Sequence, residues 1–141
     1  MNLTHNLFRK ILFTCMVCIL TCSLYAQTRD SISYPVIIQF NSECCGVPSD
    51  KPLRDFVKTF KKKYKIKKLT AVRISPMGKE GEYWLAFSFR ELTRKQTAVF
   101  TRGLKLITPK LKDPGSATIV QNFQVVRSDL PGRALLERVI F

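Results

Sequence analysis

The chain has 141 residues, with 24 lysines and arginines against 10 aspartates and glutamates, which gives a formal net charge of +14 at pH 7. This length suits one domain around a single core, and the excess of positive charge favours anionic partners. The only histidine is His5. A mature protein without the N-terminus would therefore have neither an imidazole base nor a histidine-ligated metal site.

The first 26 residues are typical of a secretory signal peptide. Arg9 and Lys10 give a basic start, residues 11–26 are apolar or small, and Gln27 opens a polar segment. The apolar run is shorter than the roughly 20 residues that a membrane-spanning helix needs. We therefore expect export with cleavage after Ala26, and no transmembrane segment afterwards. The expected location is the periplasm or the cell exterior, and the leader indicates a bacterial source.

A second interpretation of the leader is a lipid anchor. The sequence Ile-Leu-Thr-Cys at 19–22 resembles a bacterial lipoprotein box, which implies that Cys22 is lipidated. Cleavage of residues 1–26 instead leaves 115 of the 141 residues and lowers the net charge from +14 to +12, because two cations leave with the leader. Of the five cysteines, Cys44 and Cys45 alone would remain. Any disulfide within one chain would then join adjacent residues.

The first half of the mature chain predicts a strand and a helix after a short polar lead at 27–33. Residues 34–40 alternate and are rich in β-branched side chains, which indicates a strand. Ser49 or Asp50 can cap the helix that follows. Its apolar side chains recur at helical spacing and predict one buried stripe: Leu53, Phe56, Val57, Phe60 and Tyr64.

The second half predicts three strands and a second helix. Residues 69–75 and 82–89 alternate as strands on either side of a turn with two glycines and a proline. Thr93 and Gln96 then match a capping box. The helix that it starts runs to about Ile107, with these residues facing inward: Val99, Phe100, Gly103, Leu104 and Ile107.

A last clear strand is expected at 117–126, where the irregular alternation of apolar residues indicates a bulge. The C-terminal extension at 128–141 contains an apolar patch that could form a short helix or an added strand. We expect it to pack on the domain or on a partner.

The predicted order is β-α-β-β-α-β over residues 34–127. Right-handed crossovers then place both helices on one face of a four-stranded antiparallel sheet, an α+β sandwich of the ferredoxin-like, split βαβ type. The other sheet face stays open unless the C-terminal extension or a partner covers it. Strand alternation predicts that Trp84 lies on this open face, and Arg73 is expected beside it there.

Positive charge is concentrated on the first helix, its exit and the second helix. If the helices lie side by side, their outer surfaces form one basic face, which attracts lipid headgroups, lipopolysaccharide phosphates or acidic glycans. The alternative is a solvated surface without a ligand, and it is favoured by the use of lysine, which clamps phosphate less well than arginine. The candidate anion-binding residues are Lys58, Lys61, Lys62, Lys65, Lys68, Arg94 and Arg102.

The adjacent pair Cys44 and Cys45 lies in the loop before the first helix. Heavy-metal-binding domains of the same topology carry two thiols in this loop, but in a C-x-x-C motif. Adjacent side chains diverge, and an oxidising compartment disfavours free thiols. The pair is therefore interpreted as a vicinal disulfide, a bond to another chain or thiols without a role, with metal binding or a redox function as a distant alternative.

Two further resemblances share the predicted element order. GEYWLAF resembles the third strand of RNA-recognition domains, which displays stacking aromatics, but Glu82 replaces one of these rings, which argues against nucleic acid. Acylphosphatases bind phosphate with an arginine near the first helix, where Arg54 lies, but their sheet asparagine has no counterpart here.

We therefore predict no catalytic residue, cofactor or metal. The expected function is that of an exported, non-enzymatic basic domain that binds an anionic ligand or surface. The alternative is a structural or assembly component, which docks on a partner protein or on a second copy through the open sheet face and the C-terminal extension.

Overall fold

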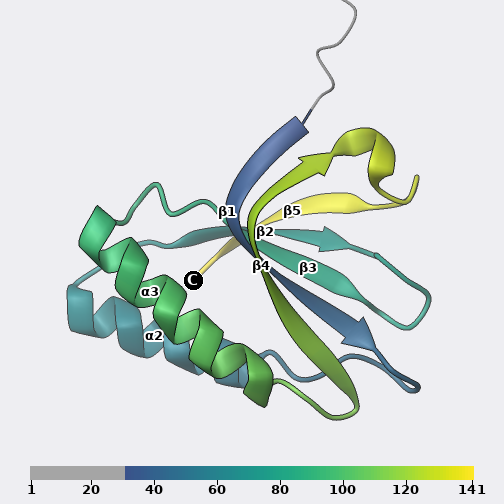
Figure 1. Cartoon of the computed structure of the whole chain (residues 1–141), viewed down its shortest axis with the longest axis horizontal. Helices are drawn as coiled ribbons and strands as arrows, with labels where there is room; N and C mark the ends of the chain where they lie inside the picture. Colours follow the sequence, from purple (N-terminus) through teal and green to yellow (C-terminus); the bar gives the residue numbers. More distant parts are fainter. Residues whose placement is uncertain (1–30) are drawn as a thin grey trace, which may run out of the picture. The chain divides into compact units, whose positions relative to one another are not determined.

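In the computed structural model of the chain, residues 31–141 can be described. The predicted leader, with His5 and the alternative anchor Cys22, lies outside these residues. Residues 31–141 form an α+β fold with a five-stranded antiparallel sheet and two helices, compatible with a two-layer sandwich (Figure 1). In chain order the elements are β1 (Ser31–Ser42), α2 (Lys51–Tyr64), β2 (Thr70–Ser75), β3 (Tyr83–Phe87), α3 (Arg94–Ile107), β4 (Gly115–Val126) and β5 (Leu135–Ile140).

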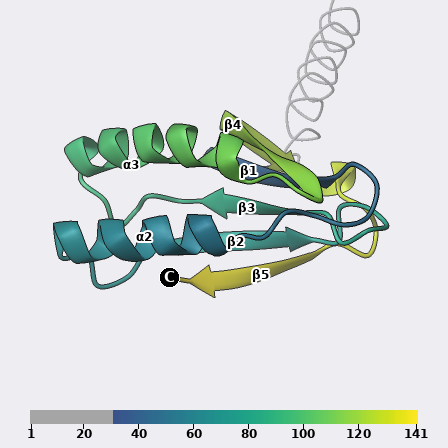
Figure 2. The ribbon, with the colours of Figure 1, turned by 90° about the horizontal axis from the view of Figure 1, so that it is seen from below.

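The strands are arranged in the order β4-β1-β3-β2-β5. The central pairing sets Val36 opposite Phe87, and β2 pairs with β3 so that Ile74 lies opposite Trp84. The C-terminal extension forms β5, which pairs antiparallel with β2 along its whole length, from Thr70 opposite Ile140 onward. Figure 2 shows β5 as the outermost strand on that side of the sheet. The sequence allowed either a short helix or an added strand for the extension, and the structure has the added strand.

Both helices begin where the sequence indicates. The predicted capping box of α3 is present, since the Thr93 hydroxyl accepts a bond from the Gln96 amide while the Gln96 side chain accepts one from the Thr93 amide. The N-cap of α2 is Asp50, but its side chain makes no capping bond. The Asp50 carboxylate pairs instead with Arg54 one turn later, at 2.8 Å.

The main core lies between the helices and the sheet. Phe100 of α3 is fully buried at its centre and contacts rings from α2 and from β3. Gly103 lets the helices approach, since a Cβ there would overlap the ring of Phe56. The apolar stripe predicted for α2 is confirmed, since its side chains pack in this core. In α3 the prediction was wrong for Val99, which is 46% exposed because it turns away from both α2 and the sheet.

The sheet face opposite the helices carries a second, smaller cluster and is only partly open. Ile37, Ile74 and Ala86 are buried there, and residues from the second half of β4 and the segment after it pack on them. The predicted irregularity of β4 has a physical cause. Asn122 has φ 52°, and the odd-numbered residues before it pack on the helix side whereas Phe123 and Val125 pack on the other. Asparagine tolerates this left-handed backbone better than most residues.

Trp84 lies in this second cluster, as its alternation predicts. Its ring meets Phe123 edge-on, with centroids 5.5 Å apart and planes at 87°. The residue opposite it on β1 is Gln39. Trp84 is therefore a partly buried packing residue beneath β4.

Candidate functional site

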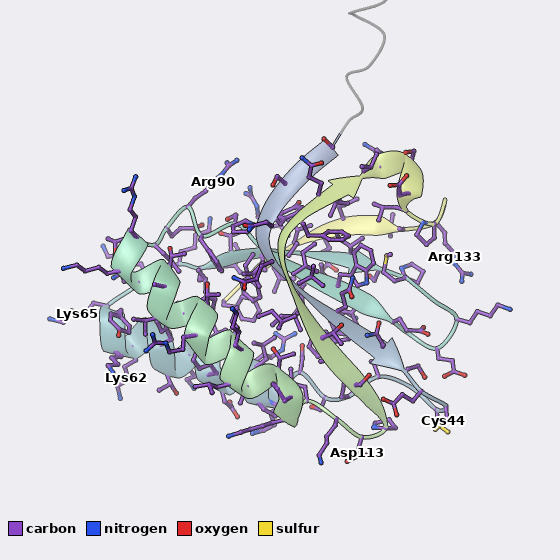
Figure 3. All side chains as sticks on the ribbon, viewed as in Figure 1. Cys44, Lys62, Lys65, Arg90, Asp113 and Arg133 are labelled. Atoms are coloured by element: carbon purple, nitrogen blue, oxygen red, sulfur yellow. The ribbon has the colours of Figure 1, made fainter. Side chains whose placement is uncertain are left out.

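The predicted basic face is formed by the outer sides of α2 and α3, which lie side by side in both views (Figures 1 and 2). Figure 3 places Lys62 and Lys65 at the end of the domain where α2 stops. Six of the seven candidates have exposed side chains: Lys58, Lys62, Lys65, Lys68, Arg94 and Arg102. The seventh, Lys61, is half-buried, and its ammonium group donates to the backbone oxygen of Phe141 beside β5.

The lysines of this face are not neutralised by acids. Between residues 31 and 141 there are two ion pairs, Lys51 with Asp55 and Arg54 with Asp50, both in the first turns of α2. None of the cations at 58–68 takes part in them. The lysines in the last turn of α2 lie at its negative dipole end, which stabilises the helix by a few tenths of a kcal/mol each. That local gain explains some of the lysines, but not those beyond the helix.

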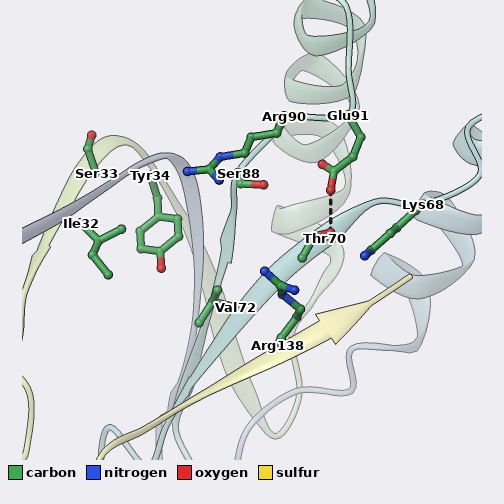
Figure 4. A pocket seen from close by; sticks show the side chains of 10 residues that line it. All are labelled: Ile32, Ser33, Tyr34, Lys68, Thr70, Val72, Ser88, Arg90, Glu91 and Arg138. Atoms are coloured by element: carbon green, nitrogen blue, oxygen red, sulfur yellow. Dashed lines mark hydrogen bonds between the residues drawn. The ribbon is translucent and has the colours of Figure 1, made fainter.

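Lys68 is set apart from the other candidates. It lines a pocket of about 360 Å³ at the end of the sheet face opposite the helices (Figure 4). Arg90 and Arg138 line the same pocket, and the sequence interpretation singled out neither. Arg90 lies in the loop after β3 and Arg138 on the added strand. Arg138 comes near Arg90 because the extension pairs with β2. The sequence did not decide whether the extension forms a strand, so it could not predict this convergence.

Arg73 was predicted on the open face, and this is wrong. The register sets it opposite Leu85, whose side chain belongs to the helix-side core. Its guanidinium lies 3.8 Å from the centroid of the Tyr83 ring, a cation–π contact. The alternation of β2 does assign Arg73 to the side of Ala71; the prediction failed because arginine was not expected beside a core, where its long stem packs and its head stacks on the ring.

Tyr83 supports a testable pH effect. Burial raises its pKa from 10.0 to about 12, and the negative charge of Asp50 adds to this, while Arg73 and Arg54 oppose it. Above pH 10 the unfolded chain loses the phenol proton that the folded protein keeps, so the free energy of unfolding falls as pH rises from about 10 to 12. Phenylalanine has no phenol proton to lose. Over this pH range we therefore expect the free energy of unfolding of Tyr83→Phe to fall by up to about 2 kcal/mol less than that of the unchanged protein. Thermal denaturation of both proteins across that pH range measures it, and parallel curves would contradict it.

The two thiols of Cys44 and Cys45 are free and exposed, with their Sγ atoms 2.8 Å apart. The hydrogen bond with the Cys45 thiol raises the pKa of Cys44, and some desolvation and the charges of Glu80 and Glu43 raise it further. A protonated thiol is a weak nucleophile and a weak metal ligand. Figure 3 shows Cys44 at the far end of the domain from Lys62 and Lys65, so the thiols and the basic face are separate features.

Within residues 31–141 no three side chains among histidine, cysteine, aspartate and glutamate gather closely enough to hold a metal ion. In the same part of the chain no helix combines the length and apolar character that crossing a bilayer requires. The sequence matches no known family model and no curated protein, and the structure matches no solved structure.

Proposed function

We propose that this chain is a small exported, non-enzymatic domain that binds an anionic surface through the basic face of α2 and α3. One observation carries the proposal: the exposed cations at 58–67 have no ion-pair partner between residues 31 and 141. Export is inferred from the leader pattern alone. We also infer that the domain is ferredoxin-like, extended by one strand, because its order is β-α-β-β-α-β and β4-β1-β3-β2 are neighbours in that order.

The chemistry of the basic face favours a surface over a small ligand. Lysine ammonium groups are strongly hydrated point charges on flexible stems, which suit diffuse attraction more than bidentate recognition. Each lysine or arginine close to an anionic membrane contributes about 1 kcal/mol, and the attraction decays within a Debye length. Lipid headgroups, lipopolysaccharide phosphates and acidic glycans all present such charge arrays outside the cytoplasm.

The test is a triple substitution, Lys58→Gln, Lys62→Gln and Arg102→Gln. At about 1 kcal/mol per residue, its affinity for anionic vesicles or for heparin at low salt should fall on the order of 100-fold. Binding of the unchanged protein should disappear near 0.5 M NaCl, where the Debye length is roughly 4 Å. Vesicle co-sedimentation and heparin chromatography measure both effects.

A matched control removes three cations elsewhere, with Lys79→Gln, Arg127→Gln and Arg133→Gln. These residues are exposed, and Figure 3 shows Arg133 at the other end of the domain from Lys62. The control should lose much less affinity than the first variant. Equal losses would mean that net charge alone matters, and binding that survives high salt would contradict the electrostatic proposal.

A second candidate is an assembly component that docks through β5. Leu135 and Ile140 are 72% and 61% exposed on this outermost strand. The amide of Phe141 donates to the Leu69 carbonyl oxygen, so by alternation the backbone groups of Leu136, Arg138 and Ile140 point away from β2. An exposed apolar edge of this kind pairs readily with another strand. Failure to bind either anionic probe, together with concentration-dependent association in light scattering, would favour this candidate.

A further inference from the structure

A second possible binding site lies on the sheet face opposite the helices, in the pocket of about 360 Å³ that Lys68 lines (Figure 4). Its volume is near the lower end of the range for small-molecule sites, about 300–1,000 Å³. Five segments supply its walls: the start of β1, the loop before β2, β2 itself, the loop after β3, and β5. The C-terminal extension contributes one of these walls through Arg138.

Three cations and one acid converge on this pocket. Arg90, Arg138 and Lys68 reach it from different segments, and Glu91 is the single carboxylate. Oε1 of Glu91 accepts a hydrogen bond from the Thr70 hydroxyl at 2.6 Å, drawn as the dashed line in Figure 4. The second carboxylate oxygen takes part in no hydrogen bond or ion pair between residues 31 and 141. The surplus of two positive charges selects an anion, while Glu91 repels a ligand that is charged on all sides.

The remaining lining adds hydroxyl and apolar contacts. Tyr34 is nearly buried, and burial raises its pKa although the charge of Arg90 opposes this, so its phenol stays protonated and can donate. Ser88 adds another hydroxyl, and Val72 lies between the polar groups as an apolar surface (Figure 4). The pocket thus combines cations for an anionic group, an acceptor for ligand hydroxyls and an apolar patch of the kind that packs against a sugar ring.

We propose that this pocket binds a monosaccharide-sized molecule that carries one anionic group and free hydroxyls. Arg90, Arg138 and Lys68 hold the anionic group, and the free oxygen of Glu91 accepts from a ligand hydroxyl. The anionic group is a carboxylate, as in a uronic acid, or a phosphate, as in a sugar phosphate. Bare inorganic phosphate is disfavoured, because Glu91 repels its negative charge and phosphate has no ring to pack on Val72. This site is independent of the basic face, since Arg90 and Arg138 do not belong to it.

The test is an NMR or calorimetric titration of the purified protein at fixed ionic strength with four probes: glucuronate, glucose 6-phosphate, glucose and inorganic phosphate. At least one of the two anionic sugars should bind saturably and at least about tenfold more tightly than glucose or phosphate, because an ionic hydrogen bond is worth about 1.5–3 kcal/mol. The tighter of the two identifies the anionic group. Equal binding of glucose, equal binding of phosphate, or no saturable binding by any probe would overturn the proposal.

Arg138→Gln and Arg90→Gln should each weaken binding of the preferred sugar by about tenfold or more. Both side chains are exposed, so at least one variant is expected to fold normally. Arg133→Gln is the matched control with the same loss of charge: Arg133 is exposed, its side chain lies near Gly78 and does not line the pocket, and this variant should bind like the unchanged protein. Glu91→Gln should bind inorganic phosphate several-fold more tightly, because the repelling charge is gone. An equal loss in Arg133→Gln, or no gain for phosphate in Glu91→Gln, would contradict the assigned roles.

Discussion

Replacing Gly115 with alanine is expected to lower the free energy of unfolding by about 3 kcal/mol, the upper end of the usual cost of overpacking. Gly115 is the buried first residue of β4. A Cβ at this position would overlap the carbonyl oxygen of Asn41 at the end of β1, and would lie 2.8 Å from the carbonyl oxygen of Gly46. Backbone oxygens cannot rotate away as a side chain does, so the start of β4 would have to separate from β1.

The matched control is Gly132→Ala. Gly132 is exposed, and an added Cβ there has no heavy atom within 4 Å. Its stability should stay within about 0.5 kcal/mol of the unchanged protein. Urea denaturation of the three proteins measures the difference through the transition midpoints at constant slope. A Gly115→Ala protein as stable as the control would show that β1 and β4 do not approach closely at this point.

The sequence predicted those parts of the fold that local chemistry determines. The α2 stripe and the Thr93 capping box depend on spacing within one helix, and both are present. The irregular alternation of β4, from which a bulge was predicted, coincides with a change of face at Asn122. Each of these signals lies within about ten residues of chain, where periodicity and capping are informative.

The sequence could not predict features that depend on contacts between distant segments. The extension has the apolar content of either a helix or a strand, and only its pairing with β2 decides between them. The same pairing brings Arg138 to the pocket that Arg90 and Lys68 line, so the pocket could not be predicted either. Arg73 was expected beside Trp84 on the open face, but the strand register sets it opposite Leu85 on the helix side, where the ring of Tyr83 accommodates the guanidinium.

The candidate residues of the basic face also fall into two groups: those whose position follows from the local sequence, and those whose position depends on distant segments. Exposure of Lys58 and Lys62 follows from their place on the outer side of α2, opposite the buried stripe. The side-chain bond of Lys61 to Phe141 depends on β5 and could not be foreseen. Lys68 was predicted to contribute to the basic face of the helices. In the structure it lines a pocket on the other side of the sheet, which also depends on contacts between distant segments.

Replacing Phe100 with alanine should lower the free energy of unfolding by about 3–5 kcal/mol, the range for removal of a buried phenylalanine ring. The side chain is fully buried. Its ring centroid lies 5.4 Å and 4.8 Å from those of Phe56 and Phe60 on α2, and 5.6 Å from that of Phe87 on β3. Phe100 therefore joins α3 both to the neighbouring helix and to the sheet, and its removal leaves a cavity that all three elements line.

Val99→Ala is the matched control, because it truncates the neighbouring residue of the same helix at a side chain that is 46% exposed. Alanine also has the higher helix propensity, so this variant should remain within about 0.5 kcal/mol of the unchanged protein. Denaturant midpoints give both values. A loss below about 1 kcal/mol for Phe100→Ala would mean that the layers hold together without this ring. A loss for Val99→Ala equal to that for Phe100→Ala would show that α3 buries a different side of its surface from the one described. The basic face depends on the same packing, since α2 and α3 present their cations together only while Phe100 fixes α3 against both the helix and the sheet.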